Sequence, residues 1–355
     1  MKRSVLTALA FGAIAFGQGT ASASEPLVLD RNAAVQFATL PDGVRFPEGI
    51  AANPATGEIF VATFDFGQPN KLLRFAANGK LGAMKDFGAA PLLGLGFDAA
   101  RGKVYVLNFG ASKLQRIAAD FDASTPVEDV ASFPSIGAPA PRNVSNPDGS
   151  SDTIMFGSGG FPAPNGMTFS RSGSLYVSDS FQGAIYRIDN VATCTMPCPV
   201  SLVAHDPLLA TAGFPPFGAN GIALDADETA LFIANTGDSR VLKMDLATRS
   251  ISVLAESVHG ADGVALDGKG RLWVAANQGD QLVALNASGR VVARLGEFQG
   301  IRRDGAPDGL LFPASPVIVG DWMYVTNLAL PLAGSPAEWE GDVTRWNVVR
   351  VKLPR

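Results

Sequence analysis

The stretch that decides the fold is Pro47-Glu48-Gly49-Ile50, because its pattern returns later in the chain. Each copy has an oxygen-bearing side chain before a glycine and an apolar residue after it. The other copies are Pro164-Asn165-Gly166-Met167, Ala219-Asn220-Gly221-Ile222 and Ala261-Asp262-Gly263-Val264. Repetition at such intervals is typical of arrays and propellers built from one supersecondary unit. The tetrapeptides therefore mark equivalent points of a repeated unit.

Each unit continues with a short apolar strand, a polar hairpin and a second, aromatic-rich strand. Six such pairs are predicted, at residues 50–52 with 59–62, 95–97 with 104–107, 167–169 with 175–178, 222–224 with 231–234, 264–266 with 272–275, and 317–319 with 323–326. Short strands separated by turn residues indicate an all-β domain. Because no long stretch has helical periodicity after the first residues, a helical fold is excluded.

Third and fourth strands complete the units. Third strands are predicted at 71–75, 113–117, 184–188, 241–244, 282–285 and 348–351, and fourth strands at 127–133, 200–204, 251–255 and 291–295, with a weaker copy near 81–87. Six four-stranded units predict a six-bladed β-propeller, a single domain over residues 24–355. Residues 35–40 are expected to complete the blade of the C-terminal strands. The ring is then closed by pairing of N- and C-terminal strands, which removes an exposed sheet edge.

The first residues have the features of an export signal. Lys2 and Arg3 precede an apolar run, and Ala21-Ser22-Ala23 offers the small residues of a cleavage site. Residues 1–23 are therefore predicted to be a signal peptide, which places the protein in the periplasm or outside the cell. The run is too short for a membrane anchor. Without Lys2 and Arg3, 26 basic residues face 33 acidic ones, a formal charge of −7, which argues against a nucleic-acid partner.

Two insertions interrupt the repeats, near residues 120–163 and 190–217. The first is rich in Pro, Gly, Ser and Asn, and it is interpreted as an excursion over one face, either a lid across the central pocket or a surface loop. The second holds the only two cysteines, Cys194 and Cys198. In an oxidising compartment these two are expected to form a disulfide that fixes the loop.

The four oxygen-bearing side chains predict a site for a hard cation. In a propeller the first strand of each blade lines the central channel, so Glu48, Asn165, Asn220 and Asp262 are expected to converge on the axis from the turns that enter these strands. Two carboxylates and two amides suit Ca²⁺, with Mg²⁺ or Mn²⁺ as alternatives. Zn²⁺ is a poorer candidate because the chain has only His205 and His259. The alternative interpretation is that these dipeptides are simply tight turns; the corresponding places in blades two and six hold Leu93 and Ser315.

On these residues the chain resembles the SMP-30/gluconolactonase/LRE-like family of calcium-dependent hydrolases, over about residues 46–353. The resemblance implies a six-bladed propeller whose catalytic cation is held by a Glu in blade one, Asn residues in blades three and four, and an Asp in blade five. Glu48, Asn165, Asn220 and Asp262 match those positions. Sugar-lactone members often carry an Arg where this chain has Ala163, and phosphotriesterase-like relatives use a His where it has Ser315 and Pro316.

The resulting hypothesis is an exported metal-dependent hydrolase of a small-molecule lactone or related ester. The cation polarises the carbonyl and activates water, and Asp262 serves as the catalytic base or nucleophile. His259 is close in sequence but is interpreted mainly as a surface histidine. Two alternatives are a non-enzymatic NHL-like binding propeller and a strictosidine-synthase-like lyase.

The expected pocket wall is apolar, which favours a hydrophobic ester over a hydroxylated sugar. It is predicted to comprise Phe64, Phe66, Phe109, Phe161, Phe181 and Phe312, although packing between blades is an equal interpretation. Six polar residues end second strands on the same face and are expected mainly to cap turns: Asp65, Asn108, Asp179, Asn235, Asn277 and Asn327. Of these, Asp65, Asn108 and Asp179 are the ones predicted to line the pocket as well.

Overall fold

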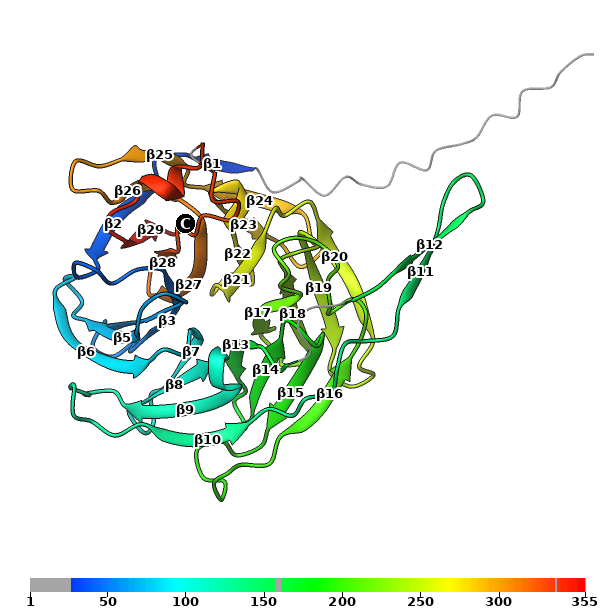
Figure 1. The fold of residues 1–355 in the computed structure, drawn as a ribbon, viewed down its shortest axis with the longest axis horizontal. Coiled ribbons are helices and arrows are strands. Elements are labelled where there is room, and N and C mark those ends of the chain that lie inside the picture. Colours follow the sequence, from blue (N-terminus) through cyan, green and yellow to red (C-terminus); the bar gives the residue numbers. More distant parts are fainter. Residues whose placement is uncertain (1–26, 157–160, 336, 355) are drawn as a thin grey trace, which may run out of the picture.

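The structure is a computed structural model that describes residues 27–156, 161–335 and 337–354, and its sheets form a ring (Figure 1). The predicted all-β, six-bladed propeller is confirmed. The predicted signal peptide, residues 1–23, lies outside the described residues. In the part of the chain that is described, no helix has the length and apolar character needed to cross a membrane.

Every blade is a four-stranded antiparallel meander whose first strand is innermost. Blade one contains β3 (Pro47–Ala52), β4 (Ile59–Thr63), β5 (Asn70–Phe75) and β6 (Leu81–Gly88), and blade two β7 (Leu92–Asp98), β8 (Lys103–Asn108), β9 (Lys113–Ala118) and β10 (Glu128–Ser132). Blade three contains β13 (Pro164–Phe169), β14 (Leu175–Asp179), β15 (Ala184–Ile188) and β16 (Ser201–His205). Blade four contains β17 (Ala219–Leu224), β18 (Ala230–Asn235), β19 (Arg240–Asp245) and β20 (Ile251–Glu256). Blade five contains β21 (Ala261–Leu266), β22 (Leu272–Ala276), β23 (Gln281–Leu285) and β24 (Val291–Leu295).

Blade six closes the ring in the way that the sequence predicts. It is built from β27 (Pro313–Val319), β28 (Trp322–Asn327), β29 (Asn347–Lys352) and the N-terminal β2 (Ala34–Thr39), which pairs antiparallel with β29. A second N-terminal contact was not predicted: β1 (Val28–Asp30) pairs parallel with β24 at the outer edge of blade five. The N-terminal segment therefore joins blades five and six.

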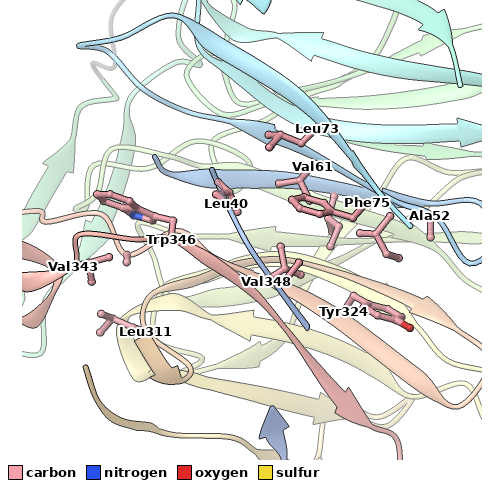
Figure 2. Close-up of a cluster of buried hydrophobic side chains, with 14 residues drawn as sticks. Leu40, Ala52, Val61, Leu73, Phe75, Leu311, Tyr324, Val343, Trp346 and Val348 are labelled. Atoms are coloured by element: carbon pink, nitrogen blue, oxygen red, sulfur yellow. The ribbon is translucent and has the colours of Figure 1, made fainter. Parts of the chain in front are cut away.

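Adjacent blades are held together by apolar clusters between their sheets. Figure 2 shows the cluster between blade six and blade one, where Val61, Leu73 and Phe75 face Tyr324 and Val348. Of these, Val61, Leu73, Phe75 and Val348 are fully buried. Burying one such side chain contributes about 1.5–3 kcal/mol, so the blade contacts dominate the stability of the ring.

The two predicted insertions differ in structure. The first forms a hairpin of β11 (Arg142–Ser145) and β12 (Ser151–Ile154), which extends outward from the ring rather than across its centre (Figure 1). The hairpin pairs around a turn at residues 146–150, which the count of prolines and glycines did not reveal. The second insertion contains the predicted disulfide between Cys194 and Cys198, whose Cα atoms are 5.5 Å apart. The Cys198 N–H donates to the Val130 carbonyl of β10, so this loop is fixed to blade two.

The remaining elements are short and lie between strands. A small hairpin of β25 (Phe298–Ile301) and β26 (Pro307–Gly309) precedes blade six. Within the described residues, 3-10 helices occur at η1 (Phe109–Ala111), η2 (Asn277–Gly279) and η3 (Trp339–Asp342). Of these, η1 and η2 directly follow second strands at the face where the candidate site lies.

Candidate metal centre

The four predicted donors lie inside the first strands, at a bulge, and not in turns. In each of the six blades the pairing of first and second strands shifts by one residue at this point, for example between Pro164 and Met167 of β13. A bulge places an extra residue on one strand and re-aims its side chain. The prediction of entry turns was therefore wrong, and the bulge is what points Glu48, Asn165, Asn220 and Asp262 away from the sheet.

In blades one to five, the glycine after the bulged position is required because the backbone of the next blade approaches closely. A Cβ added at Gly49, Gly94, Gly166, Gly221 or Gly263 would lie 2.0, 2.3, 2.5, 2.6 or 2.6 Å from the backbone oxygen of Leu93, Asn165, Asn220, Asp262 or Ala314, respectively. These distances are far inside van der Waals contact, so only glycine fits. The interpretation of the Asn-Gly and Asp-Gly pairs as turn dipeptides is excluded, because these glycines pack the inner strands around the axis.

The structure brings the four donors together around one pocket. Glu48, Asn165, Asn220 and Asp262 line the same cavity, and each is 2–5% exposed. Blade two contributes Leu93 at the equivalent position, as predicted. In blade six the equivalent residue is Ala314 and not Ser315, because the bulge follows Pro313 there. Four donors from blades one, three, four and five thus face one point.

The ionised forms of Glu48 and Asp262 are unfavourable in this pocket without a cation. Burial, and to a lesser extent the charge of Asp262, raise the pKa of Glu48 well above its ordinary value. Burial raises the pKa of Asp262 to about 7, although the side-chain amides of Asn277 and Asn220 oppose the shift. Glu48 Oε2 and Asp262 Oδ1 are buried without a hydrogen-bond partner. A buried, unpaired carboxylate costs several kcal/mol, so two of them side by side need a counter-charge.

The donor set fits a hard divalent cation. Among the described residues, no group of three or more His, Cys, Asp and Glu side chains could hold a metal. This site instead combines two carboxylates with two amides, all of them oxygen ligands of the kind that Ca²⁺ prefers. The unpartnered carboxylate oxygens of Glu48 and Asp262 are free to bind such an ion, and Asn277 Oδ1 is a third buried oxygen of this pocket without a partner. The described residues that line the pocket include no cysteine or histidine side chain that could bind a metal.

A second ring of side chains lies next to the donors, at the residue that follows each second strand. It comprises Phe64, Phe109, Ser180, Thr236, Asn277 and Leu328, all of them 5% exposed or less. The members in blades three, four and five are polar, and each contacts the donor of its own blade: Asn165 Nδ2 donates to Ser180 Oγ, Asn220 Nδ2 to Thr236 Oγ1, and Asn277 Nδ2 to Asp262 Oδ2. The members in blades six, one and two are apolar. One half of the pocket is therefore polar and the other half hydrocarbon.

The pocket is small and mostly apolar. Its volume is about 50 Å³, and its wall is completed by Phe64, Pro215, Phe217, Phe312, Leu328, Leu330 and Leu332. Phe64 and Phe312 were predicted to line it. Phe109, Phe161 and Phe181 form a network of ring contacts with Phe64 and Phe217 at its border, and Phe66 is 72% exposed. Phe217, Leu330 and Leu332 were missed because they come from loops outside the repeat.

A second cavity, of about 500 Å³, is lined by the same inner strands beyond the bulges. It contacts Asn165 and Asn220 but also residues such as Leu95, Met167 and Leu266. Since its lining includes neither Glu48 nor Asp262, the two carboxylates belong to the small pocket. Asn165 and Asn220 therefore lie between the small pocket and this wider one.

Other predicted site residues lie elsewhere. His205 and His259 are exposed, as expected for surface histidines. Asp65 forms an ion pair with Arg45, Asn108 caps η1 and Asp179 accepts from the N–H groups of Phe181 and Gln182. These three therefore have structural roles and do not line the donor pocket. Asn277, which was expected mainly to cap a turn, is the strand-end residue that reaches the site, and its place in the repeat next to Ser180 and Thr236 was the available signal.

The family comparison agrees with this geometry. Residues 214–296 match the family described as SMP-30/Gluconolactonase/LRE-like region. The chain thus carries an SMP-30/gluconolactonase/LRE-like region. The matched segment includes Asn220 and Asp262 with their glycines, and the resemblance predicted from the sequence is confirmed. No curated protein sequence matches the chain significantly.

Solved structures share the fold of this chain at low sequence identity. Regucalcin, a calcium-binding protein from Agrobacterium tumefaciens, has a TM-score of 0.62 at 14% identity, over 92% of this chain and 95% of that one. A gluconolactonase from Xanthomonas campestris has a TM-score of 0.53 at 14% identity, over 89% and 88%. A virginiamycin B lyase from Staphylococcus aureus has a TM-score of 0.53 at 13% identity, over 90% and 98%. At these identities the similarity establishes the fold, and one fold can carry different chemistries.

Proposed function

We propose that this protein is an exported, metal-dependent hydrolase of apolar lactones or related esters, with Ca²⁺ as the favoured cation. The observation that carries the proposal is the pair of buried, unpartnered carboxylate oxygens, Glu48 Oε2 and Asp262 Oδ1, in a pocket that also presents Asn165 and Asn220. When bound, the cation supplies Lewis-acid stabilisation of the negative charge that develops on a carbonyl oxygen and lowers the pKa of bound water. A calcium-binding protein and a gluconolactonase that share this fold are precedents for the two parts of the proposal.

Asp262 is the residue proposed to act on the substrate. Asn277 Nδ2 holds its Oδ2 at 3.0 Å, which leaves Oδ1 unpartnered and fixes the plane of the carboxylate. In the proposed reaction this carboxylate accepts a proton from water or attacks the carbonyl carbon. Glu48 contributes charge for binding the cation. It lies close enough to Asp262 for the charge of that residue to raise its pKa.

The wall of the pocket supports an apolar substrate. A volume of about 50 Å³ is enough for the reacting ester group and little more. The rest of the substrate is proposed to lie against exposed rings near the entrance, of which Phe66 is 72% and Phe161 is 41% exposed. Apolar walls with few polar groups are the usual composition of sites that bury hydrophobic ligands. The half of the second ring formed by Phe64, Phe109 and Leu328 would face the hydrocarbon part.

The test measures bound metal together with hydrolysis of lactones and aryl esters, before and after chelation and after Ca²⁺ is added back. We expect activity to disappear on chelation and to return with calcium. Asp262→Asn should abolish turnover, and Glu48→Gln should lower calcium affinity. Asp225→Asn is the control, because that carboxylate caps the blade-four hairpin at Thr229 and Ala230 and lies outside the pocket. Full turnover by Asp262→Asn with metal still bound would exclude the proposed role of Asp262.

Two other outcomes would point to other functions. Turnover that survives complete metal removal would contradict the metal-dependent proposal, and a product formed without uptake of water would support a lyase. Tight binding of a peptide or glycan on this face, with neither metal nor turnover, would support a binding propeller. In both cases Glu48 and Asp262 would have to be neutralised by protonation instead of by a cation. The metal content of the purified protein is therefore the first measurement that separates these functions from the proposed one.

A further inference from the structure

The three polar residues of the second ring determine which atom each ligand can present. Ser180 Oγ lies 2.7 Å from the Ala219 carbonyl oxygen, and Thr236 Oγ1 lies 2.7 Å from the Ala261 carbonyl oxygen. A carbonyl cannot donate, so each hydroxyl must give its only proton to that carbonyl. The hydroxyl can then only accept from its other neighbour, the side-chain amide of the donor residue. The amide must therefore turn its NH₂ group toward the hydroxyl.

These hydrogen bonds fix the orientation of both amide ligands. Asn165 Nδ2 lies 3.0 Å from Ser180 Oγ, and Asn220 Nδ2 lies 2.9 Å from Thr236 Oγ1. Because a side-chain amide has one nitrogen and one oxygen, placing the nitrogen on the hydroxyl leaves Oδ1 for the channel. A flipped amide would aim NH₂ at the cation and also lose its hydrogen bond. The hydroxyl thus selects the ligating orientation before any ion arrives.

In blade five the ligand to be oriented is the carboxylate of Asp262. Asp262 can only accept when ionised, so a hydroxyl committed to a backbone carbonyl would leave it without a donor. At this position the chain has Asn277 instead, whose Nδ2 donates to Asp262 Oδ2 at 3.0 Å. Gly260 is what makes room for it, since a Cβ at Gly260 would lie 1.8 Å from Asn277 Oδ1. The residue type in the second ring therefore follows the ligand type: hydroxyl for amide, and amide for carboxylate.

We propose that Ser180, Thr236 and Asn277 are positioning residues that set the cation affinity of the site by fixing the orientation of Asn165, Asn220 and Asp262. This inference rests on the proposed cation site and assigns a role to three residues that bond the side chains of its proposed ligands. Each positioning residue is 2% exposed or less, so its hydrogen bond competes with no bulk water. Outer-shell partners of metal ligands typically contribute 10- to 100-fold in affinity.

The test is calcium titration by calorimetry of the wild type and of Ser180→Ala, Thr236→Val and Asn277→Leu. Each variant should bind calcium about 10- to 100-fold more weakly. Ser180→Thr and Thr236→Ser keep the hydroxyl and should bind within a few-fold of the wild type. Thermal unfolding without calcium is recorded for every variant, so that loss of the fold is separated from loss of affinity.

Ser178→Ala is the matched control. Ser178 lies two residues before Ser180 and also donates to a backbone carbonyl of blade four, that of Asn220, but its other partner is the Gly166 N–H rather than a ligand side chain. We expect it to lower the unfolding temperature and leave calcium affinity nearly unchanged. If it weakens calcium as much as Ser180→Ala does, the effect is general packing and the inference is wrong. Wild-type affinity in Ser180→Ala and Thr236→Val overturns it as well, whereas a wild type that binds no divalent cation refutes the proposed function itself.

Discussion

Without a cation, the ionised carboxylate of Asp262 should destabilise the fold, and Asp262→Asn should relieve that cost. The side chain is 4% exposed, and burial raises its pKa from 3.8 to about 7. A raised folded-state pKa means that the native protein binds more protons than the unfolded chain between these values. Stability therefore falls as pH rises through this window and stays low above it.

The magnitude follows from the size of the shift. A difference of about three pKa units at about 1.4 kcal/mol each corresponds to about 4 kcal/mol at pH 8. The metal-free Asp262→Asn variant should be more stable than the metal-free wild type at pH 8 by up to this amount, and the difference should shrink toward pH 5. With calcium the difference should close, because an ion at 1,000 times its dissociation constant stabilises the wild type by about 4 kcal/mol.

Urea unfolding at pH 5 and pH 8, with and without calcium, measures these differences. Asp225→Asn is a control of opposite sign: although burial raises its pKa, hydrogen bonds from Ala230 and Thr229 lower it overall, so its charge stabilises the fold at pH 8. That variant should be less stable than the wild type at pH 8 in either buffer. The reasoning fails if the metal-free wild type and Asp262→Asn have the same dependence on pH, or if calcium stabilises both equally.

Three further predictions concern the ring, the wall and a neighbouring acid. Gly221→Ala places a Cβ 2.6 Å from the Asp262 carbonyl oxygen and should cost about 1–3 kcal/mol in chemical unfolding, with weaker calcium binding, whereas Gly268→Ala, which has no atom within 4 Å, should cost neither. Phe217→Ala widens the pocket and should raise kcat/KM for bulky esters relative to small ones by about tenfold, and an unchanged ratio would remove Phe217 from the wall. Burial raises the pKa of Asp280 to about 6, so wild-type stability should fall by about 1–3 kcal/mol between pH 4 and pH 6 from this group, and urea unfolding of Asp280→Asn should lack that fall while keeping the bond from the Phe312 N–H.

The sequence was sufficient for the blades because each unit repeats the same local pattern. Alternation, hairpin residues and spacing predict all six strand pairs, and the unpaired segment at 35–40 predicts the closing strand β2. The short strand β1 had no repeat to compare with and lies at an outer edge, where pairing needs only three residues. A short β-strand can therefore be predicted from the sequence when it has a known position in a repeat, and β1 has none.

The candidate site was predicted in composition and not in geometry. Glu48, Asn165, Asn220 and Asp262 line one pocket, but the bulge that aims them depends on pairing between strands, which a single sequence does not contain. The same one-residue shift is why Ala314, rather than Ser315, occupies the blade-six position. Side chains from loops, such as Phe217, were missed because the repeat does not extend to them. The role of Asn277 depends on its hydrogen bond to Asp262, and a single sequence does not show that these two side chains are neighbours.

Ring closure has a consequence for when the donors assemble. The strands β2 and β29 that seal blade six are among the most distant segments of the described chain, and Thr326 of that blade donates to the backbone oxygen of Glu48. Asn165, Asn220 and Asp262 come from three consecutive blades, whereas Glu48 lies in blade one, which the seal joins to blade six. Contacts between such distant segments are costly in chain entropy. An ion that needs all four ligands is therefore expected to bind best to the closed ring.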